Sequence, residues 1–319
     1  MTIPQGTHLF VTGGAGFIGT ALASRLSGCC QITLYDSFKQ NALKNVPIDS
    51  ESGIHVIQGD VLDLAHLKKA MKKATHVVHL AAIAGVDAVL ENPVLTMKVN
   101  LQGTLHALEA ACEVSRFERF VDFSTSEVFG THAYKVEETH LTSQGSVGEA
   151  RWSYAVSKLA GEFLSHSFFH QYQLPTVIIR PFNIYGPNQV GVGAVHHFVV
   201  RALKGQDLIV TGDGSQIRAW CYIDDIVEAL LSALFKPEAV GEAFNIGNAR
   251  STVTIYDLAQ KILHLSGSSS RLVFKPLDYT DVEIRVPNID KARTLLGYEP
   301  KVDLEEGLSR TIEWYRSHL

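Results

Sequence analysis

The sequence is poor in cysteine and has no histidine pattern that is typical of a metal site. Its 4 cysteines include the adjacent pair Cys29 and Cys30, and no two of them form a Cys-x-x-Cys pair. A secreted disulfide framework needs cysteines at regular spacings, so we expect reduced thiols in a cytoplasmic protein. The 14 histidines form no His-Glu-x-x-His motif. We therefore expect no metal ion.

Long apolar runs and an excess of basic charge are also missing. His79, Asp87 and Glu91 interrupt the longest apolar region, which leaves no segment long enough to span a membrane. The first six residues have neither the charged nor the apolar part of a signal peptide. The net charge is −5, with signs mixed along the chain, so the basic surface that nucleic acid requires is absent. We expect a function that involves neither membrane nor nucleic acid.

What the sequence contains is a regular alternation of β-rich apolar runs and helical stretches. With 319 residues, of which 46% are hydrophobic, the chain can bury a large core and form two lobes. The alternation is typical of a parallel sheet with helices on both faces. The predicted strands are 8–12, 31–36, 54–58, 75–80, 120–124 and 176–180, and the predicted helices are 17–26, 65–73, 94–115 and 154–172. The expected fold class is α/β, with a doubly wound parallel sheet of the Rossmann type.

The C-terminal part is less regular and predicts a smaller mixed α/β lobe. Its predicted elements are a strand at 243–247 and helices at 224–235, 254–266 and 304–317. We expect residues 1–185 to form the cofactor-binding domain, with elements near 221–248 returning to it. Residues 186–220 and 249–319 are then expected to form the substrate-binding lobe.

The turn after the first predicted strand carries the glycine motif Thr12-Gly-Gly-Ala-Gly-Phe-Ile-Gly19. Residues without a Cβ let the backbone approach a pyrophosphate at the N-terminus of the next helix. Asp36 ends the second strand, where a carboxylate accepts hydrogen bonds from a ribose diol and repels a 2′-phosphate, so NAD is favoured over NADP. Asp60 ends the third strand, where it either meets the adenine or caps a helix. The predicted NAD contacts are Gly13, Gly16, Phe17, Ile18, Gly19, Asp36, Asp60, Val61, Leu80, Ala81 and Ala82.

A tyrosine and a lysine stand four residues apart in Tyr154-Ala-Val-Ser-Lys158, within a predicted helix. Side chains at this spacing project from one face of a helix. An ammonium beside a phenol is expected to lower the pKa of the phenol, because opposite charge favours the phenolate. We therefore predict that Tyr154 removes the proton of an alcohol while the cofactor accepts a hydride.

Together these motifs resemble the extended short-chain dehydrogenase/reductases, the NAD-dependent epimerases and dehydratases that modify nucleotide sugars. The resemblance covers nearly the whole chain, and its motifs occur in the family's order. They are Thr12 to Gly19, Asp60-Val61, His79-Leu-Ala-Ala82, Asn100, Ser124-Thr-Ser-Glu-Val-Phe-Gly130, Tyr154 to Lys158, Arg180-Pro-Phe-Asn-Ile-Tyr-Gly-Pro187 and Gly212-Asp-Gly-Ser-Gln-Ile-Arg218.

The resemblance implies a role for several residues. Tyr154 takes the proton of the sugar 4-hydroxyl while the hydride passes to NAD, which is regenerated later in the cycle. Lys158 holds the nicotinamide ribose, and Thr125 hydrogen-bonds the 4-oxygen. The other implied cofactor contacts are Asn100, Ser124 and Pro181, and the implied substrate contacts are Asn183, Val195, Arg218 and Arg285.

The residues after Thr125 bear on the choice of reaction. A 4-keto sugar has an acidic hydrogen at C5, and a C6 carboxylate on it becomes a β-keto acid that can lose carbon dioxide. Glu127 is expected to act there as a base or a positioning group, with Ser126 as a further catalytic residue. Thr-Ser-Glu is similar to UDP-glucuronate decarboxylases and GDP-mannose-type dehydratases, whereas dTDP-glucose dehydratases carry Asp in place of Ser126. The stretches 151–158 and 282–288 also resemble the decarboxylases, so decarboxylation of UDP-glucuronate is the predicted reaction.

Other functions stay open beside this prediction. They are 4-epimerisation of UDP-glucuronate or UDP-glucose, and 4,6-dehydration of a nucleotide-linked hexose. A non-catalytic NAD sensor is disfavoured because Tyr154, Lys158 and Thr125 are all present. The predicted helices 94–115 and 154–172 carry apolar residues on more than one face, and the resemblance implies that they pair across a two-fold axis in a homodimer.

Overall fold

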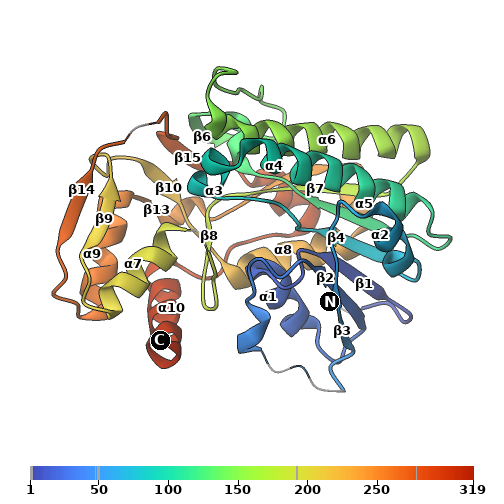
Figure 1. The fold of residues 1–319 in the computed structure, drawn as a ribbon, viewed down its shortest axis with the longest axis horizontal. Coiled ribbons are helices and arrows are strands. Elements are labelled where there is room, and N and C mark those ends of the chain that lie inside the picture. The colour runs from blue at the N-terminus through green and yellow to red at the C-terminus, as the bar shows by residue number, and fades with distance from the viewer. Residues whose placement is uncertain (1–2, 47, 49–50, 192, 278) are drawn as a thin grey trace.

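The computed structural model describes residues 3–46, 48, 51–191, 193–277 and 279–319 (Figure 1). Seven parallel strands form its central sheet, in the order β12-β7-β5-β4-β1-β2-β3. Their bounds are β1 (His8–Thr12), β2 (Gln31–Asp36), β3 (Ile54–Gln58), β4 (His76–His79), β5 (Arg119–Phe123), β7 (Thr176–Pro181) and β12 (Ala243–Ile246). The predicted doubly wound parallel sheet is confirmed. The strand order reverses between β1 and β4, and ligands of such sheets bind at this switch point.

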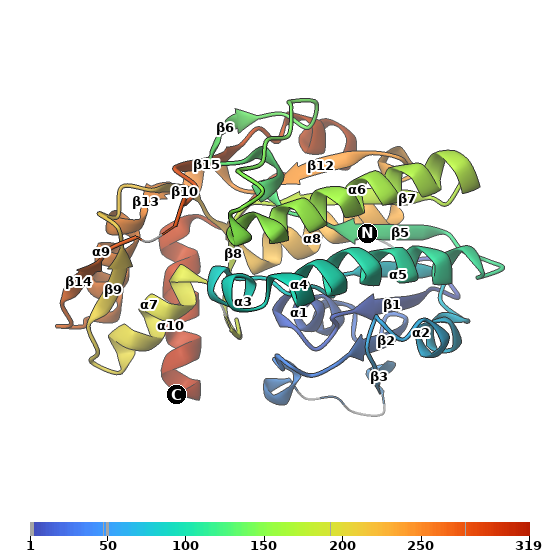
Figure 2. The same ribbon diagram turned by 45° about the horizontal axis from the view of Figure 1, so that its top comes forward.

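Helices cover both faces of the sheet (Figures 1 and 2). On one face α1 (Phe17–Leu26) lies beside α8 (Ile223–Phe235), and Leu22 and Ile226 belong to one apolar core cluster. On the other face α2 (Leu64–Met71), α5 (Gly103–Cys112) and α6 (Ser153–Tyr172) cover a second cluster, which includes Leu67 and Leu108. Every residue of β5 is buried, as expected for a strand covered on both sides.

The segment predicted as one helix over 94–115 is divided. It consists of α4 (Pro93–Met97), a π-helical turn over Lys98–Gln102 and then α5. The π-helical turn carries Asn100, and such turns are frequent at functional sites. Apolar periodicity predicted the helix but gave no sign of the wider turn inside it.

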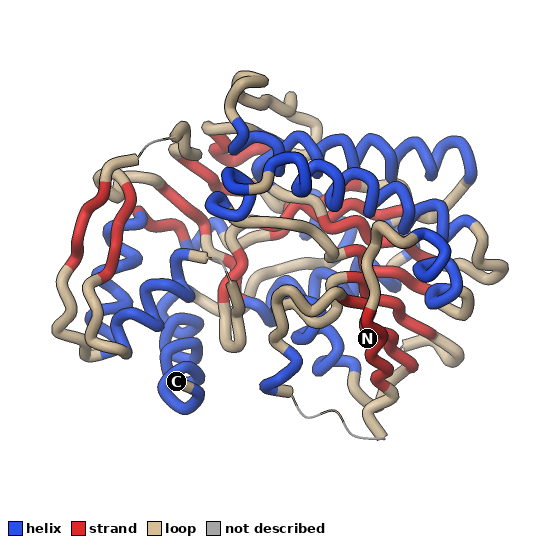
Figure 3. Tube along the Cα trace, in the orientation of Figure 1, coloured by secondary structure: helices blue, strands red, loops and turns tan. Residues whose placement is uncertain are grey.

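The C-terminal lobe contains a second, mixed sheet beside the carboxyl ends of the central strands (Figure 3). It has the order β13-β10-β15-β6, and its parallel pair β10–β15 places Arg218 directly opposite Arg285. Its strands are β6 (His132–Val136), β10 (Ile217–Ala219), β13 (Thr252–Thr254) and β15 (Ile284–Pro287). The remaining elements of the second half are β8 (Ile184–Tyr185), α7 (Ala194–Leu203), β9 (Leu208–Thr211), β11 (Cys221–Tyr222), α9 (Ile255–Ser266), β14 (Leu272–Lys275) and α10 (Leu304–His318).

In the described parts of the chain, no helix combines the length and the apolar character needed to cross a bilayer. The 4 cysteines are free thiols, and Cys221 alone among them is buried.

A buried ion pair joins α6 to β7 beneath the site. The Arg180 guanidinium donates from Nη2 to Glu162 Oε2 at 2.7 Å and from Nε to Glu162 Oε1 at 3.0 Å. Both side chains are more than nine-tenths buried. Each charge therefore depends on its partner, because neither is in contact with enough water to be stabilised alone.

Glu162→Gln is expected to destabilise the fold by about 3–5 kcal/mol, because it leaves the buried Arg180 without a countercharge. Denaturant unfolding at pH 7 measures this loss. The matched control is Glu228→Gln, which breaks the exposed pair with Arg25 and is expected to change the free energy of unfolding by about 1 kcal/mol or less. Equal losses in the two variants would contradict the structural role of the buried pair.

Candidate active site

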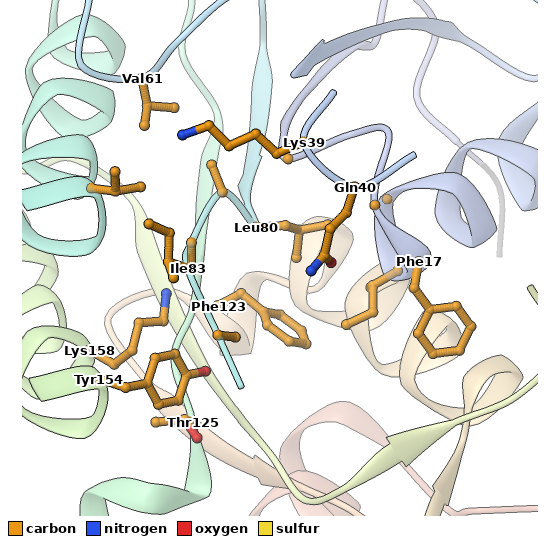
Figure 4. Close-up of a pocket in the computed structure, with 18 of the residues that line it drawn as sticks. Phe17, Lys39, Gln40, Val61, Leu80, Ile83, Phe123, Thr125, Tyr154 and Lys158 are labelled. Carbon is orange, nitrogen blue, oxygen red and sulfur yellow. The ribbon is translucent and has the colours of Figure 1, made fainter. Parts of the chain in front are cut away.

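A cavity of about 640 Å³ runs along the carboxyl ends of the central strands. It extends from the glycine turn after β1 to Tyr154 at the start of α6 (Figure 4). Most of the predicted contacts line it. They are Gly13, Gly16, Phe17, Ile18, Gly19, Asp36, Asp60, Val61, Leu80, Ala81, Ala82, Ser124, Thr125, Ser126, Tyr154, Lys158, Pro181, Asn183 and Arg285.

The glycine turn forms one end of the cavity, and residues with a Cβ would not fit into this turn. Gly13 has a φ of +67°, and a Cβ there would lie 2.7 Å from the backbone nitrogen of Ala81. Gly16 precedes the first residue of α1, and its position provides no side-chain cap for the helix. The helix N-terminus thus faces the cavity with its backbone accessible, which suits a dinucleotide pyrophosphate.

Asp36 lies at the end of β2 with both carboxylate oxygens held by the backbone. Oδ2 accepts from the Ala15 amide at 3.0 Å and Oδ1 from the Phe38 amide at 2.7 Å. Burial raises the pKa of Asp36, and these hydrogen bonds offset part of the increase. Each oxygen keeps a second lone pair, so the carboxylate can still accept from a ribose hydroxyl.

Asp60 is not a helix cap. Asp63 caps α2 by accepting from the His66 amide at 3.0 Å, whereas Asp60 accepts from the Leu62 amide at 2.9 Å. Asp60 lines the cavity, and its contact with the adenine stays a prediction.

Two polar residues that we did not predict lie at this end of the cavity, Lys39 and Gln40 (Figure 4). They follow Asp36 by three and four residues, and this short separation is the only feature of the sequence that could have predicted their position.

Asn100 does not line the cavity but forms hydrogen bonds with Ile83, a residue that does. Its Oδ1 accepts from the Ile83 amide at 2.8 Å, and its Nδ2 donates to the Ile83 carbonyl at 3.1 Å and to Ser157 Oγ at 3.1 Å. Ser157 Oγ in turn donates to the carbonyl of Tyr154 at 2.7 Å. Asn100 therefore fixes the cavity-lining Ile83 relative to the start of α6, rather than lining the cavity itself.

Tyr154 and Thr125 lie side by side near Lys158 (Figure 4). Burial raises the pKa of the Tyr154 phenol above its usual range, and the nearby Glu127 carboxylate raises it further. A hydrogen bond with the Thr125 hydroxyl and the charge of Arg285 offset part of this increase. The expectation that the pKa of this phenol is lowered is therefore wrong, because burial and the Glu127 charge outweigh the positive charge of Arg285.

Lys158 is buried beside carboxylates of the sheet and of its own helix. Burial lowers its pKa, and the charges of Asp122 and Glu162 offset part of the decrease. Ser124, at the end of β5, donates a short hydrogen bond to Glu162. Lys158 is thus held close to Tyr154 with countercharges beneath it.

Glu127 follows Thr125 in the short 3₁₀ turn Ser126–Phe129, and two arginines bind its carboxylate. Arg151 Nη1 donates to Oε2 at 3.0 Å, and Arg285 Nη1 lies 3.5 Å from Oε1. Burial acts to raise the pKa of Glu127, but the charges of Arg285 and Arg151 overcome it and hold the pKa below its usual value. Glu127 is therefore an ionised group at neutral pH.

The same ion-pair chain continues to the second predicted arginine. Asp281 Oδ1 accepts from Arg151 Nη2 at 3.2 Å, and its Oδ2 accepts from Arg218 Nη2 at 3.3 Å. Burial and the adjacent Arg285 charge lower the pKa of Arg218 to about 10. Sequence reasoning did not predict a role for Asp281 or for the side chain of Arg151. No local signal marks them, because the contact joins residues far apart in the chain.

The remaining predicted substrate residues occupy different surroundings. Asn183 lines the cavity and donates from Nδ2 to the Ala219 carbonyl at 3.0 Å. Val195 is buried in the apolar core on α7, and Arg218 is the register partner of the cavity-lining Arg285 but does not itself line the cavity. Residues 192 and 278 of the predicted substrate-binding lobe lie outside the described residues. Within the described residues, no three His, Cys, Asp or Glu side chains come together as metal ligands.

Asp36→Asn is expected to weaken binding of NAD by about tenfold, since a charge-assisted hydrogen bond contributes on the order of 1.5 kcal/mol or more. It is also expected to reduce discrimination against NADP, because the negative charge that repels a 2′-phosphate is removed. Fluorescence titration of wild type and variant with both dinucleotides measures the two effects. An unchanged preference for NAD in a folded variant would contradict the role given to Asp36.

Comparison with known proteins agrees with this geometry. The model of the NAD dependent epimerase/dehydratase family matches residues 9–247. A UDP-N-acetyl-alpha-D-glucosaminuronate decarboxylase of Bacillus cytotoxicus is 34% identical in an alignment of 316 positions that covers 96% of this chain and 97% of that protein. UDP-glucuronic acid decarboxylase 1 of Danio rerio is 33% identical, over 98% of this chain and 73% of its own length.

A solved structure gives the same result. The UDP-glucuronic acid 4-epimerase of Bacillus cereus, determined in complex with UDP-glucuronic acid and NAD, has a TM-score of 0.89 and is 30% identical, over 98% of this chain and 100% of that one. The cofactor is NAD, and the chain is an enzyme that modifies nucleotide sugars. It belongs to the NAD-dependent epimerase/dehydratase family of extended short-chain dehydrogenase/reductases.

Proposed function

We propose that this enzyme decarboxylates a UDP-linked uronate, with UDP-glucuronate as the substrate, through a 4-keto intermediate. The observation that supports this proposal most strongly is the state of Arg285. Among the described residues, nothing accepts a hydrogen bond from its buried Nε and Nη2 atoms. Arg285 lines the cavity, and its charge acts on the Tyr154 phenol. A buried guanidinium with free donors beside the proposed base suits the carboxylate of a uronate.

The charge balance of the site supports the same substrate class. The ion-pair chain contains three guanidinium groups, those of Arg151, Arg218 and Arg285, and two carboxylates, those of Glu127 and Asp281. It therefore has an excess positive charge. An excess buried charge is costly without a partner, so the site favours a substrate that brings negative charge.

The first step is oxidation at C4 of the sugar. NAD, when bound, would supply the acceptor for the hydride of C4. Tyr154 takes the proton of the 4-hydroxyl, Thr125 holds the 4-oxygen, and Lys158 orients the ribose of the cofactor. The raised pKa of Tyr154 in the protein makes this phenol a strong base once its proton is lost.

The second step breaks the bond between C5 and the carboxylate carbon. The 4-ketone accepts the electron pair as an enolate, carbon dioxide leaves, and C5 then takes a proton from solvent as the ketone re-forms. Glu127 is a weak base because two arginines hold it ionised with a lowered pKa. We therefore assign it the positioning of Arg285 rather than proton removal. The returned hydride and the proton of Tyr154 restore the 4-hydroxyl.

A second candidate is 4-epimerisation of the same uronate. It is favoured by the similarity to the Bacillus cereus 4-epimerase, and an anion site beside Tyr154 suits either reaction. The decarboxylase similarity, which covers 96% of this chain and 97% of the relative, favours loss of the carboxylate.

Mass spectrometry of the product tests the proposal. The enzyme is incubated with NAD and UDP-glucuronate, and in parallel with UDP-N-acetylglucosaminuronate and UDP-glucose. A product lighter by one carbon dioxide from UDP-glucuronate is expected, and Tyr154→Phe is the inactive control. Unchanged mass with a new chromatographic position would establish the 4-epimerase instead. Turnover of UDP-glucose alone would contradict the uronate assignment.

Glu127→Gln is expected to reduce loss of carbon dioxide by about 100-fold or more while leaving oxidation at C4, because the amide cannot hold Arg285 by charge. Absorbance of reduced NAD measures C4 oxidation, and mass spectrometry measures the later step. Equal rates of product formation in variant and wild type would refute the role of Glu127.

We also propose that the enzyme is a homodimer through the outer surface of α3 (Val86–Glu91), α4 and α6, where these helices lie side by side (Figure 2). Several large apolar side chains are exposed on this surface. Val94 is 80% exposed and Phe163 is 67% exposed, and Leu90 and Val156 are exposed as well. Large apolar side chains exposed together on neighbouring helices are typical of a contact between proteins.

Phe163→Glu is expected to convert the dimer to a monomer, because a charge placed in an apolar contact loses its hydration. Light scattering coupled to gel filtration measures the mass. The control is Phe274→Glu, at a half-exposed position on β14, which should leave the dimer intact. A monomeric wild type, or a dimeric Phe163→Glu, would contradict this interface.

A further inference from the structure

Arg151 joins the two carboxylates that hold the site's other arginines. It lies in the 3₁₀ turn Ala150–Trp152, immediately before α6. One guanidinium nitrogen donates to Glu127 at 3.0 Å and the other donates to Asp281 at 3.2 Å. These two partners come from segments far apart in the chain, so Arg151 is the connection between them.

The shape of the guanidinium explains why an arginine occupies this position. Its planar fork can donate to two carboxylates in fixed directions, whereas a lysine ammonium acts as a point charge. The group is only 4% exposed and lies 4.7 Å from the centre of the Trp152 ring, which restricts its movement further. Arg151 is thus fixed in orientation as well as charged.

The two carboxylates that Arg151 holds also fix the positions of Arg285 and Arg218. The second oxygen of Glu127 contacts Arg285, and the second oxygen of Asp281 contacts Arg218. Arg218 and Arg285 are register partners on β10 and β15, so two positive charges stand next to each other. Without the carboxylates between them they would repel one another in a buried place.

We infer that Arg151 is a positioning residue for the reaction, which sets Arg285 through Glu127 and Arg218 through Asp281. This inference rests on the proposed function, because it assumes that Arg285 meets an anionic substrate. Arg151 itself does not line the cavity and has no part in bond making. Arg151 affects turnover only by positioning the carboxylates of Glu127 and Asp281.

The charged groups that face Glu127 determine whether the loss of Arg151 raises or lowers the pKa of Glu127. They are Arg285 from β15, Arg218 from β10, Arg151 from the turn before α6, Tyr154 from α6 itself, and Asp281 from the segment before β15. The two arginines hold the pKa of Glu127 below its usual value. Removal of Arg151 raises that pKa, so Glu127 becomes protonated at a higher pH than in the wild type.

The test compares Arg151→Met, which removes the charge and the fork, with Arg151→Lys, which keeps the charge alone. In Arg151→Met, kcat is expected to fall by about tenfold or more and the acid limb of its pH profile to move up by about one unit, because a nearby charge is lost. In Arg151→Lys the acid limb is expected to stay near its original place while kcat remains low. Arg119→Met is the control, since this buried arginine donates to the carbonyls of Ala233 and Lys236 at the end of α8 and should not move the limb.

A double-mutant cycle separates positioning from a general structural role. Arg151→Met in the Glu127→Gln background is expected to lower the rate of carbon dioxide loss by about twofold or less, because residues that act through one another are not additive. A full tenfold loss in both backgrounds, or an unmoved acid limb, would overturn the inference.

A measurement without substrate keeps the inference testable if the proposed function fails. The difference in Tm between wild type and Arg151→Met should be largest near neutral pH and shrink as the pH falls, because Glu127 has a lowered pKa and its pairing is lost on protonation. A difference that is constant with pH indicates packing alone and would contradict the inference. A wild type that does not act on UDP-glucuronate contradicts the proposed function, while leaving this result valid.

Discussion

The buried chain of charges from Arg285 to Arg218 is the constraint on which the site depends. Burying an arginine is costly unless carboxylates satisfy it, and here three guanidinium groups share two carboxylates. Among the described residues, Nε of Arg151 and both Nε and Nη2 of the cavity-lining Arg285 have no hydrogen-bond partner. Under the proposed function, the free donors of Arg285 bind an anion next to the proposed base Tyr154.

The ion-pair chain of arginines and carboxylates reaches the cofactor cavity because two sheets meet there. The central parallel sheet places the glycine turn, Asp36 and Tyr154 along one cavity at the strand ends. The second sheet supplies Arg218 and Arg285 from neighbouring strands. Arg151, at the start of the helix that carries Tyr154, connects the two sheets through Glu127 and Asp281. Under the proposed function, chemistry at C4 and selection at C6 both depend on this junction.

Local features of the sequence were predictable, and long-range contacts were not. The central strands, the helix over 17–26 and the glycine turn follow from short apolar runs and from residues without a Cβ, so their prediction succeeded. The π-helical turn around Asn100 leaves no trace in apolar periodicity. The contact of Arg151 with Asp281 joins distant segments, and the direction of the Tyr154 pKa depends on burial. The contact and the pKa shift both depend on the folded structure, so the sequence alone could not predict them.

The most direct test of the central claim is the affinity of the site for charged and neutral sugars. Calorimetric titration of the Tyr154→Phe variant with bound NAD compares UDP-glucuronate with UDP-glucose in the absence of turnover. An excess positive charge at Arg285 predicts that the uronate binds about tenfold more tightly or better, which corresponds to about 1.4 kcal/mol. Substitution of Arg285 by methionine should remove that difference. Equal affinities of the two nucleotide sugars for the Tyr154→Phe variant would contradict the account.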